Sequence, residues 1–391
     1  MFFISLFLIL ILGVFCSFLF EKIRIPSLIG YLLIGIVIGP YCLNLIDNGI
    51  LDISSELGEI ALIFILIRAG LSLNLKDLKR IGRPAVLMCF VPAILEMVAV
   101  GLIAPLFFDI SYLDAFILGS VLGAVSPAVV VPKMLEMIEK GQGVKKGIPQ
   151  LIIAGSSLDD VAMIVIFTAL TTVATGGSLG VMTFIDVPLS IILGIGAGVA
   201  IGLLLSWLFK KIHIRDSVKV MIICGFAFGL YGLEVLLEGI VGFSGLLASM
   251  TIGITILAKN APLAERLSSK YSKLWLVADI MLFVLVGASV DLNYFFSNLG
   301  LGILLIVIVL VFRSAGVYLS LIGTNLNKNE KLFTVISYIP KATVQAAIGA
   351  IPMAMGIPGG ELILSIAVIS ILFTSPLGAL GMDLTVNKLI K

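Results

Sequence analysis

Apolar stretches long enough to cross a lipid bilayer follow one another along almost the whole chain. Of its 391 residues, 60% are hydrophobic and 12% are charged, whereas about a quarter are charged in soluble domains. One crossing takes about 20 apolar residues, so we expect a single polytopic, all-α membrane unit of about thirteen transmembrane helices over residues 1–391. The predicted spans are 2–20, 26–43, 57–74, 84–108, 113–137, 147–174, 187–209, 217–236, 239–258, 273–290, 298–324, 331–356 and 361–386.

The lysines and arginines support this division and orient it. All but four of the 25 fall in alternate loops or at the C-terminus. By the positive-inside rule those loops are cytoplasmic, which places the N-terminus outside a cell membrane and the C-terminus in the cytoplasm. The four exceptions lie within spans and are Arg68, Lys133, Arg313 and Lys341. A net charge of +2 gives no indication of nucleic-acid binding.

Two pairs of segments recur about 215 residues apart, which indicates an internal repeat. Residues 30–39 resemble 244–253, and residues 68–75 resemble 285–292. The offset contains an odd number of spans, so the two copies, spans 1–6 and 8–13, must be inverted in the membrane. Inverted repeats are typical of secondary transporters, whose substrate sites form near the midplane between discontinuous helices.

Two prolines occupy corresponding places in these repeats. Pro127 interrupts the span GAVSPAVVVP, and Pro340 interrupts SYIPKATVQ. Proline removes a backbone donor and disrupts the preceding turn, which a membrane tolerates only where the backbone lines a polar cavity. We therefore predict two discontinuous helices that cross near the membrane midplane.

Adjacent aspartates, Asp159 and Asp160, follow two serines in the otherwise apolar segment GSSLDD. They lie about 17 Å along the helix from Ile148, near the middle of a core about 30 Å thick. A carboxylate at that depth is costly, so it is a candidate functional group. Oxygen ligands favour hard cations, and no thiolate or histidine cluster offers a site for a soft metal. The predicted set that binds Na⁺ or Li⁺ and protons comprises Asp159, Asp160, Ser126, Ser156 and Thr343.

Neighbouring carboxylates in a poorly solvated site titrate in separate steps, so one of them can hold either a proton or a metal cation. That competition is sufficient to couple opposed fluxes without ATP. The candidate counter-charges lie on other spans. We expect Glu96 and Arg313, which are repeat mates, to form an ion pair that neutralises both charges. Lys341 either balances Asp159 or lies across the crossing of the broken helices.

Several motifs resemble the monovalent cation/proton antiporter superfamily. They are SPAVVVPKMLEM (126–137), KKGIPQLIIAGSSLDD (145–160), RSAGVYLS (313–320) and PKATVQAA (340–347). The resemblance covers essentially the whole chain and is greatest to the NHA branch of sodium/proton antiporters, related to the NapA-type exchangers. It implies an NhaA/NapA-like fold, a homodimer, and an ion-translocating core that moves like an elevator. The implied core is about 84–174 and 298–386, and the implied dimerisation scaffold is about 1–74 and 187–290.

The resemblance also implies residue roles. Asp160 would be the principal ion-binding carboxylate and Asp159 its partner. Arg313 stands where electrogenic relatives have a lysine that pairs with the first aspartate, and here Glu96 is available to it instead. Because arginine does not lose its proton, this difference favours electroneutral exchange of one proton per Na⁺, whereas the two aspartates could carry two protons. Related potassium-efflux systems carry a nucleotide-binding domain, which we do not expect in this chain.

The sequence thus predicts a membrane antiporter that exchanges Na⁺ or Li⁺ for protons by alternating access. It uses no cofactor, and its partners are the cations, protons, the bilayer and a second copy of the chain. A K⁺/H⁺ antiporter or K⁺-efflux system of the same fold is one alternative. A sodium-coupled symporter of an organic anion, which also has crossed broken helices, is another. An enzyme is disfavoured, because no histidine within the spans could complete a catalytic triad with the serines.

Overall fold

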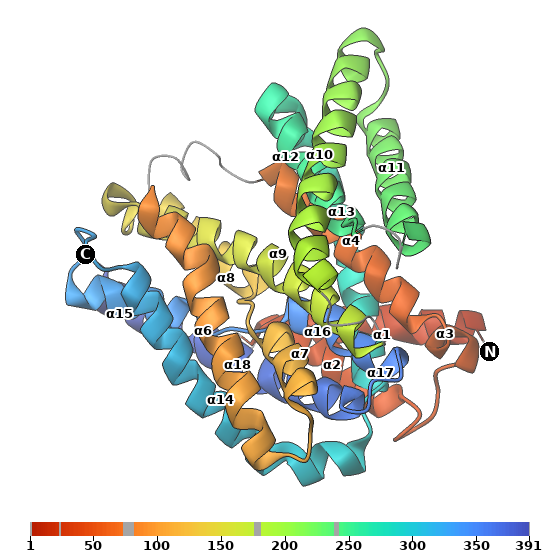
Figure 1. Cartoon of the computed structure of the whole chain (residues 1–391), viewed down its shortest axis with the longest axis vertical. Coiled ribbons are helices and arrows are strands. Elements are labelled where there is room, and N and C mark those ends of the chain that lie inside the picture. The colour runs from red at the N-terminus through yellow and green to blue at the C-terminus, as the bar shows by residue number, and fades with distance from the viewer. Residues whose placement is uncertain (1, 23–24, 73–81, 176–180, 238–241, 391) are drawn as a thin grey trace. The chain divides into compact units, whose positions relative to one another are not determined.

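The computed structural model describes residues 2–22, 25–72, 82–175, 181–237 and 242–390 (Figure 1). Within these ranges all regular structure is helical, which confirms the all-α prediction. The chain groups into two compact units by its internal contacts. Unit 1 comprises Met1–Ser55, Lys76–Ala174 and Ile280–Lys391, and unit 2 comprises Glu56–Leu75 and Thr175–Asp279.

The helices of unit 1 come from both ends of the sequence. They are α1 (Phe2–Lys22), α2 (Ser27–Ile38), α3 (Asn48–Leu51), α6 (Arg83–Phe107), α7 (Tyr112–Leu122), α8 (Pro127–Glu139), a 3₁₀ turn (Val144–Lys146), α9 (Ile148–Ala174), α14 (Leu292–Ser320), α15 (Lys328–Ser337), α16 (Thr343–Gly349), α17 (Ile351–Ala354) and α18 (Gly360–Leu389). Unit 2 holds most of α4 (Ser54–Ser72) and α13 (Ala261–Ala288), and all of α10 (Val181–Lys211), α11 (Asp216–Leu237) and α12 (Gly245–Lys259).

Eight described helical segments are long and apolar enough to cross a membrane, and shorter apolar helices accompany them. A helix or a broken helix lies at the place of every predicted span, with some boundaries displaced. The start predicted at 273 is wrong, because α13 begins at Ala261. Its first turns carry Glu265, Arg266 and Lys270 and contain no helix breaker after Pro262, so the helix extends well beyond its apolar part.

Two other boundaries follow from local chemistry. The end predicted at 43 is wrong, because α2 stops at Ile38 and its C-cap Gly39 is extended, as the residue before a proline prefers. The start predicted at 239 lies outside the described residues, and α12 begins at Gly245 behind Ser244, whose hydroxyl accepts a bond from the Leu247 amide. Arg24 and the basic loop at 76–80, used to orient the chain, also lie outside the described residues, as does the end of the repeat segment 68–75.

Both predicted helix breaks are present in unit 1. Helix α7 ends at Leu122, and α8 begins at Pro127, a first-turn position where the missing N–H of proline costs nothing. Helix α15 ends at Ser337, and α16 begins only at Thr343. The breaks meet directly: the Ser126 amide donates to the Pro340 carbonyl at 2.8 Å. Two discontinuous helices therefore cross here, as the sequence predicts.

Small residues bring the surrounding helices of unit 1 into close contact. On α14, a side-chain carbon at Gly316 would lie 2.7 Å from the Pro92 Cα of α6. On α7, one at Gly119 would lie 2.6 Å from the Met97 carbonyl oxygen of α6. Such glycines let membrane helices approach backbone to backbone. As a result, Glu96 on α6 is held between α7 and α14, next to the first break.

Candidate functional site

A charged network lies at the crossing of the two broken helices, and all its members belong to unit 1. Glu96 is fully buried on α6, and Arg313 on α14 is 1% exposed. The Arg313 Nη1 atom donates to Glu96 Oε2 at 2.6 Å. The structure thus forms the ion pair expected between these repeat mates, which satisfies two charges that would each be costly alone in hydrocarbon.

Arg313 also joins both breaks and the helix that carries the aspartates. Its Nη1 donates to the Gly123 carbonyl at the end of α7 at 2.5 Å, and its Nε donates to the Tyr338 carbonyl at the end of α15 at 2.6 Å. Its Nη2 donates to Asp159 Oδ2 at 3.1 Å. The resemblance suggested that Arg313 pairs with Glu96 instead of Asp159. In the structure it pairs with both carboxylates. It uses the several donors that a guanidinium presents in fixed directions.

Lys341 stands in the second break and is fully buried. Its ammonium lies 2.7 Å from Glu96 Oε1 and donates to the Leu122 carbonyl at 2.5 Å. Of the two predicted arrangements, the structure therefore has the one in which Lys341 crosses to the first break. Its partner is Glu96, so Glu96 is shared between two cations.

Gln345 completes the set of groups that bind the end of α7, and the sequence analysis did not identify it. Its Nε2 donates to the carbonyls of Val121 and Ala124 at 2.9 and 3.0 Å. A helix end leaves its last carbonyls without partners, and here amide, ammonium and guanidinium groups from the second half of the chain satisfy them. The sequence signal that could have identified Gln345 is its amide side chain in KATVQ, directly after the second break.

The two aspartates differ in their surroundings. Asp159 is fully buried, and its Oδ2 accepts from the Val125 amide and from Arg313. Asp160 is 8% exposed and has no ion pair with a described residue. One oxygen of each, Oδ1, has no hydrogen-bond partner among the described groups. These are the polar atoms that a proton or a metal cation could bind.

Hydroxyl groups at the starts of the two inner half-helices are similarly available. Ser126 caps α8 and Thr343 opens α16, and both side chains are buried. Neither hydroxyl has a hydrogen-bond partner within the described part of the chain. Ser156 has a different environment, because its hydroxyl donates to the Ile153 carbonyl of its own helix at 3.2 Å. This bond uses the hydrogen and leaves the lone pairs of the oxygen, so ion binding by Ser156 stays a prediction.

The donor set suits an alkali cation as cargo. Among the described residues, no three or more His, Cys, Asp and Glu side chains are grouped so that they could hold a metal ion. The available atoms are carboxylate, hydroxyl and carbonyl oxygens, which are ligands for hard cations. Pro127 and Pro340 take no part as ligands and instead set the two breaks that bring these oxygens together.

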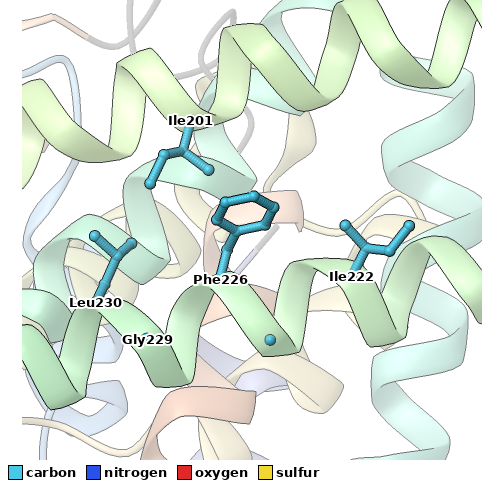
Figure 2. A pocket seen from close by; sticks show the side chains of 6 residues that line it. Ile201, Ile222, Phe226, Gly229 and Leu230 are labelled. Carbon is cyan, nitrogen blue, oxygen red and sulfur yellow. The ribbon is translucent and has the colours of Figure 1, made fainter.

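A separate cavity in unit 2 is unsuited to an ion. It has a volume of about 440 Å³ and lies along α11, with Ile201 contributed by α10 (Figure 2). Its lining is entirely apolar and consists of Ile201, Ile222, Gly225, Phe226, Gly229 and Leu230. None of these six residues has a charged or hydroxyl side chain that could replace the water around a cation. The candidate site is therefore the crossing of the two broken helices in unit 1, beside Asp159 and Asp160.

Comparison with known proteins agrees with this geometry. Residues 6–388 match the family described as "Sodium/hydrogen exchanger, transmembrane". Human sodium/hydrogen exchanger 9B2 is 32% identical over 384 residues, covering 94% of this chain and 70% of the relative. Human sodium/hydrogen exchanger 9B1 is 31% identical over 357 residues, covering 86% and 67%.

The fold is also that of a solved transporter. The structure of the sodium proton antiporter MjNhaP1 from Methanocaldococcus jannaschii at pH 8 superposes with a TM-score of 0.85 at 23% identity, covering 98% of this chain and 97% of the other. The match extends over both broken helices and every helix that contributes to the charged network. On these grounds the chain belongs to the transmembrane sodium/hydrogen exchanger family.

Proposed function

We propose that this multi-pass membrane protein is a secondary antiporter that exchanges Na⁺ or Li⁺ for protons by alternating access. It is a transporter and not an enzyme. The observation that carries the proposal is the pair of buried carboxylates, Asp159 and Asp160, each with an oxygen that no described group binds. Buried polar atoms are normally satisfied, so unpaired carboxylate oxygens beside a helix crossing favour a site for a cationic substrate.

Asp160 is the principal binding group in this proposal. Asp159 is held by a backbone amide and by Arg313, whereas Asp160 has no cationic partner in the described structure. A carboxylate can hold a proton or a metal cation but not both at once. Protons therefore displace the cation on one side of the membrane, and the cation displaces protons on the other. The hydroxyls of Ser126 and Thr343 supply further oxygen ligands.

The charges of the network favour electroneutral exchange. Glu96 and Asp159 are balanced by Arg313 and Lys341, which are in ion-pair contact with them. Asp160 then contributes the single remaining negative charge, which one proton or one monovalent cation neutralises. Each cycle would move one cation against one proton. A moving core that carries no net charge in either loaded form crosses the bilayer at the lowest electrostatic cost.

The protein is proposed to act as a homodimer in a cell membrane, with its C-terminus in the cytoplasm. The supporting observations are the family membership and the bias of lysine and arginine toward one set of loops. The moving core is proposed to comprise about 84–174 and 298–386, and the scaffold about 1–74 and 187–290. Contacts within the chain group 1–55 with unit 1, so the scaffold assignment of the first helices rests on the resemblance alone.

Transport by purified protein in proteoliposomes tests the proposal. With an imposed pH gradient, adding Na⁺ or Li⁺ outside the vesicles should move protons, and Asp160→Asn should abolish the movement. Preference for K⁺ over Na⁺ would favour the K⁺/H⁺ exchanger. Sodium-driven uptake of an organic anion, with no proton movement, would favour the symporter. Exchange that persists unchanged in Asp160→Asn would refute the assignment of the site.

A further inference from the structure

Tyr338 lies in the second break, and its hydroxyl group lies beside α9, the helix that carries Asp159 and Asp160. The residue directly follows α15 and is 1% exposed. Its hydroxyl lies against Gly155 of α9, so closely that a side-chain carbon at position 155 would overlap the hydroxyl oxygen. Gly155 is one helical turn before Asp159, and residues four apart lie on the same helix face.

Arg313 fixes the position of Tyr338 from the other side. The guanidinium donates to the Tyr338 carbonyl at 2.6 Å, and its central carbon lies 5.5 Å from the centre of the tyrosine ring. The same guanidinium donates to Asp159. Tyr338 is therefore held through its carbonyl by the guanidinium that also pairs with Asp159. Its hydroxyl lies against Gly155, which is nearer along α9 than Asp159 to Ile148, the end that the proposed orientation makes cytoplasmic.

The hydroxyl of Tyr338 has no hydrogen-bond partner among the described residues. Leaving a buried hydroxyl unbound is unfavourable, and buried tyrosine hydroxyls usually find a partner. Phenylalanine would fill the same space without that penalty. The presence of an oxygen at this place, without a partner in the described part of the chain, thus points to a bound ligand.

We propose that the Tyr338 hydroxyl is a further binding group for the transported cation, one helical turn from Asp159 on the cytoplasmic side. Its oxygen contributes to the coordination of the partly dehydrated ion, directly or through one bound water, as the ion moves between the cytoplasm and the aspartates. The inference rests on the proposed exchange function and names a ligand that the sequence motifs did not identify.

The test is Tyr338→Phe, assayed by Na⁺-dependent proton movement. The apparent KM for Na⁺ should rise about 3- to 10-fold, the loss expected for one hydrogen-bonding ligand, with the maximal rate retained within about twofold. The rise should be larger for Na⁺ added at the cytoplasmic face. Tyr271→Phe is the matched control, because that buried hydroxyl already contacts Cys224 at 3.2 Å and the Val220 carbonyl at 3.3 Å in unit 2.

A second pair of variants separates ligation from packing. Gly155→Ala should displace the tyrosine hydroxyl and raise the KM. Adding Gly155→Ala to Tyr338→Phe should raise the KM by a smaller factor, because the overlap with the oxygen is gone and only the tighter-than-usual contacts with Met88 Cβ at 3.1 Å and with the ring Cζ at 3.2 Å remain. If Tyr338→Phe does not transport, Na⁺ binding is measured instead by thermal stabilisation in detergent. The Na⁺ concentration that gives half of the maximal stabilisation then takes the place of KM.

An unchanged KM, or an unchanged half-maximal concentration, would overturn the inference. If the wild-type protein exchanges Na⁺ for protons and Tyr338→Phe behaves identically, the proposed function stands and the tyrosine has no binding role. If the wild-type protein moves no protons in response to Na⁺ or Li⁺, the proposed function itself fails. The two failures are therefore distinguishable in one set of vesicles.

Discussion

The Nη2 atom of Arg313 lies 3.1 Å from Oδ2 of Asp159, an ion pair that spans 154 positions of sequence. Asp160, the next residue, makes no such pair with any described cation. Two adjacent and chemically identical side chains thus have different contacts in the folded protein. Asp159 joins the helices of the crossing through Arg313, and Asp160 is the carboxylate that we propose binds the substrate cation.

Neutralising each aspartate should therefore have different consequences. Asp160→Asn should abolish exchange and leave the melting temperature in detergent close to that of the wild type. Asp159→Asn should also destabilise the protein by about 1–3 kcal/mol, because a charged hydrogen bond to Arg313 is lost. Thermal unfolding measured beside proteoliposome transport checks both expectations. Equal destabilisation by the two substitutions would contradict the division of roles.

Glu96→Gln should be among the most destabilising single substitutions in unit 1. It leaves Arg313 and Lys341 buried with one carboxylate fewer, and breaking a buried ion pair from one side costs about 3–5 kcal/mol. Glu96→Gln combined with Lys341→Gln should recover part of that loss, since one of the uncompensated cations is removed. A double-mutant cycle on the melting temperature measures the coupling. Strict additivity would mean that the Glu96 and Lys341 pair contributes nothing.

Gln345→Leu should destabilise the first break, although Gln345 lies on α16, directly after the second break. Val121 and Ala124 would each lose the only side-chain donor to their carbonyls among the described contacts, at about 1–3 kcal/mol for each buried carbonyl left unbound. Gln142→Leu is a suitable control, because Gln142 is paired with Asn387 in an exposed contact and should change stability by only about 0.5 kcal/mol. Similar melting temperatures for the two variants would argue against the role of Gln345.

Removing the hydroxyls of Thr343 and Ser156 one at a time should show which of them contributes more to Na⁺ binding. Thr343→Val removes a buried hydroxyl that has no described partner, and it should raise the apparent KM for Na⁺ about 3- to 10-fold. Ser156→Ala removes a hydroxyl whose orientation is fixed by its bond to the carbonyl of Ile153, so we expect the smaller effect there, with the KM within about twofold of wild type. Initial rates over a series of Na⁺ concentrations give both values. A larger rise in KM for Ser156→Ala than for Thr343→Val would show that Ser156 contributes more to Na⁺ binding than Thr343.

Protons should act as competitive inhibitors of Na⁺ binding. Because one carboxylate holds either ligand, lowering the pH should raise the apparent KM for Na⁺ by up to about tenfold per pH unit without lowering the maximal rate. Transport measured at saturating and at low Na⁺ over a range of pH distinguishes this from inactivation. A maximal rate that falls in parallel with the affinity would show that acid acts elsewhere.

The architecture could be predicted because its causes are local or periodic. Apolar length located the membrane helices, and the matched prolines Pro127 and Pro340 located both breaks. The pairing of Glu96 with Arg313 followed from their equivalent places in the two repeats and from the cost of leaving either charge alone in hydrocarbon. Each of these inferences needed only spacing along the chain and one physical rule.

The remaining site features depend on three-dimensional contacts that spacing does not encode. Ser156 stands near the aspartates in sequence, yet its hydroxyl bonds to its own backbone, a choice that serines in helices often make. Lys341 was predicted either to balance Asp159 or to lie across the crossing of the broken helices, and only the folded structure shows that it crosses and pairs with Glu96. Gln345 and Tyr338 contact residues more than 180 positions earlier in the chain, so the sequence pattern around each could not give its partners.

The carbonyls at the end of α7 have a consequence for how the protein is made. Their donors, Arg313 and Gln345, come 190 to 224 positions later in the chain than the carbonyls they bind. During synthesis, α7 and α8 therefore exist for a long time before the groups that satisfy this break have left the ribosome. The first half of the chain cannot complete its own binding site, and the crossing forms only after the second half has been inserted. The residues proposed to bind the ion are therefore among the last to reach their final environment.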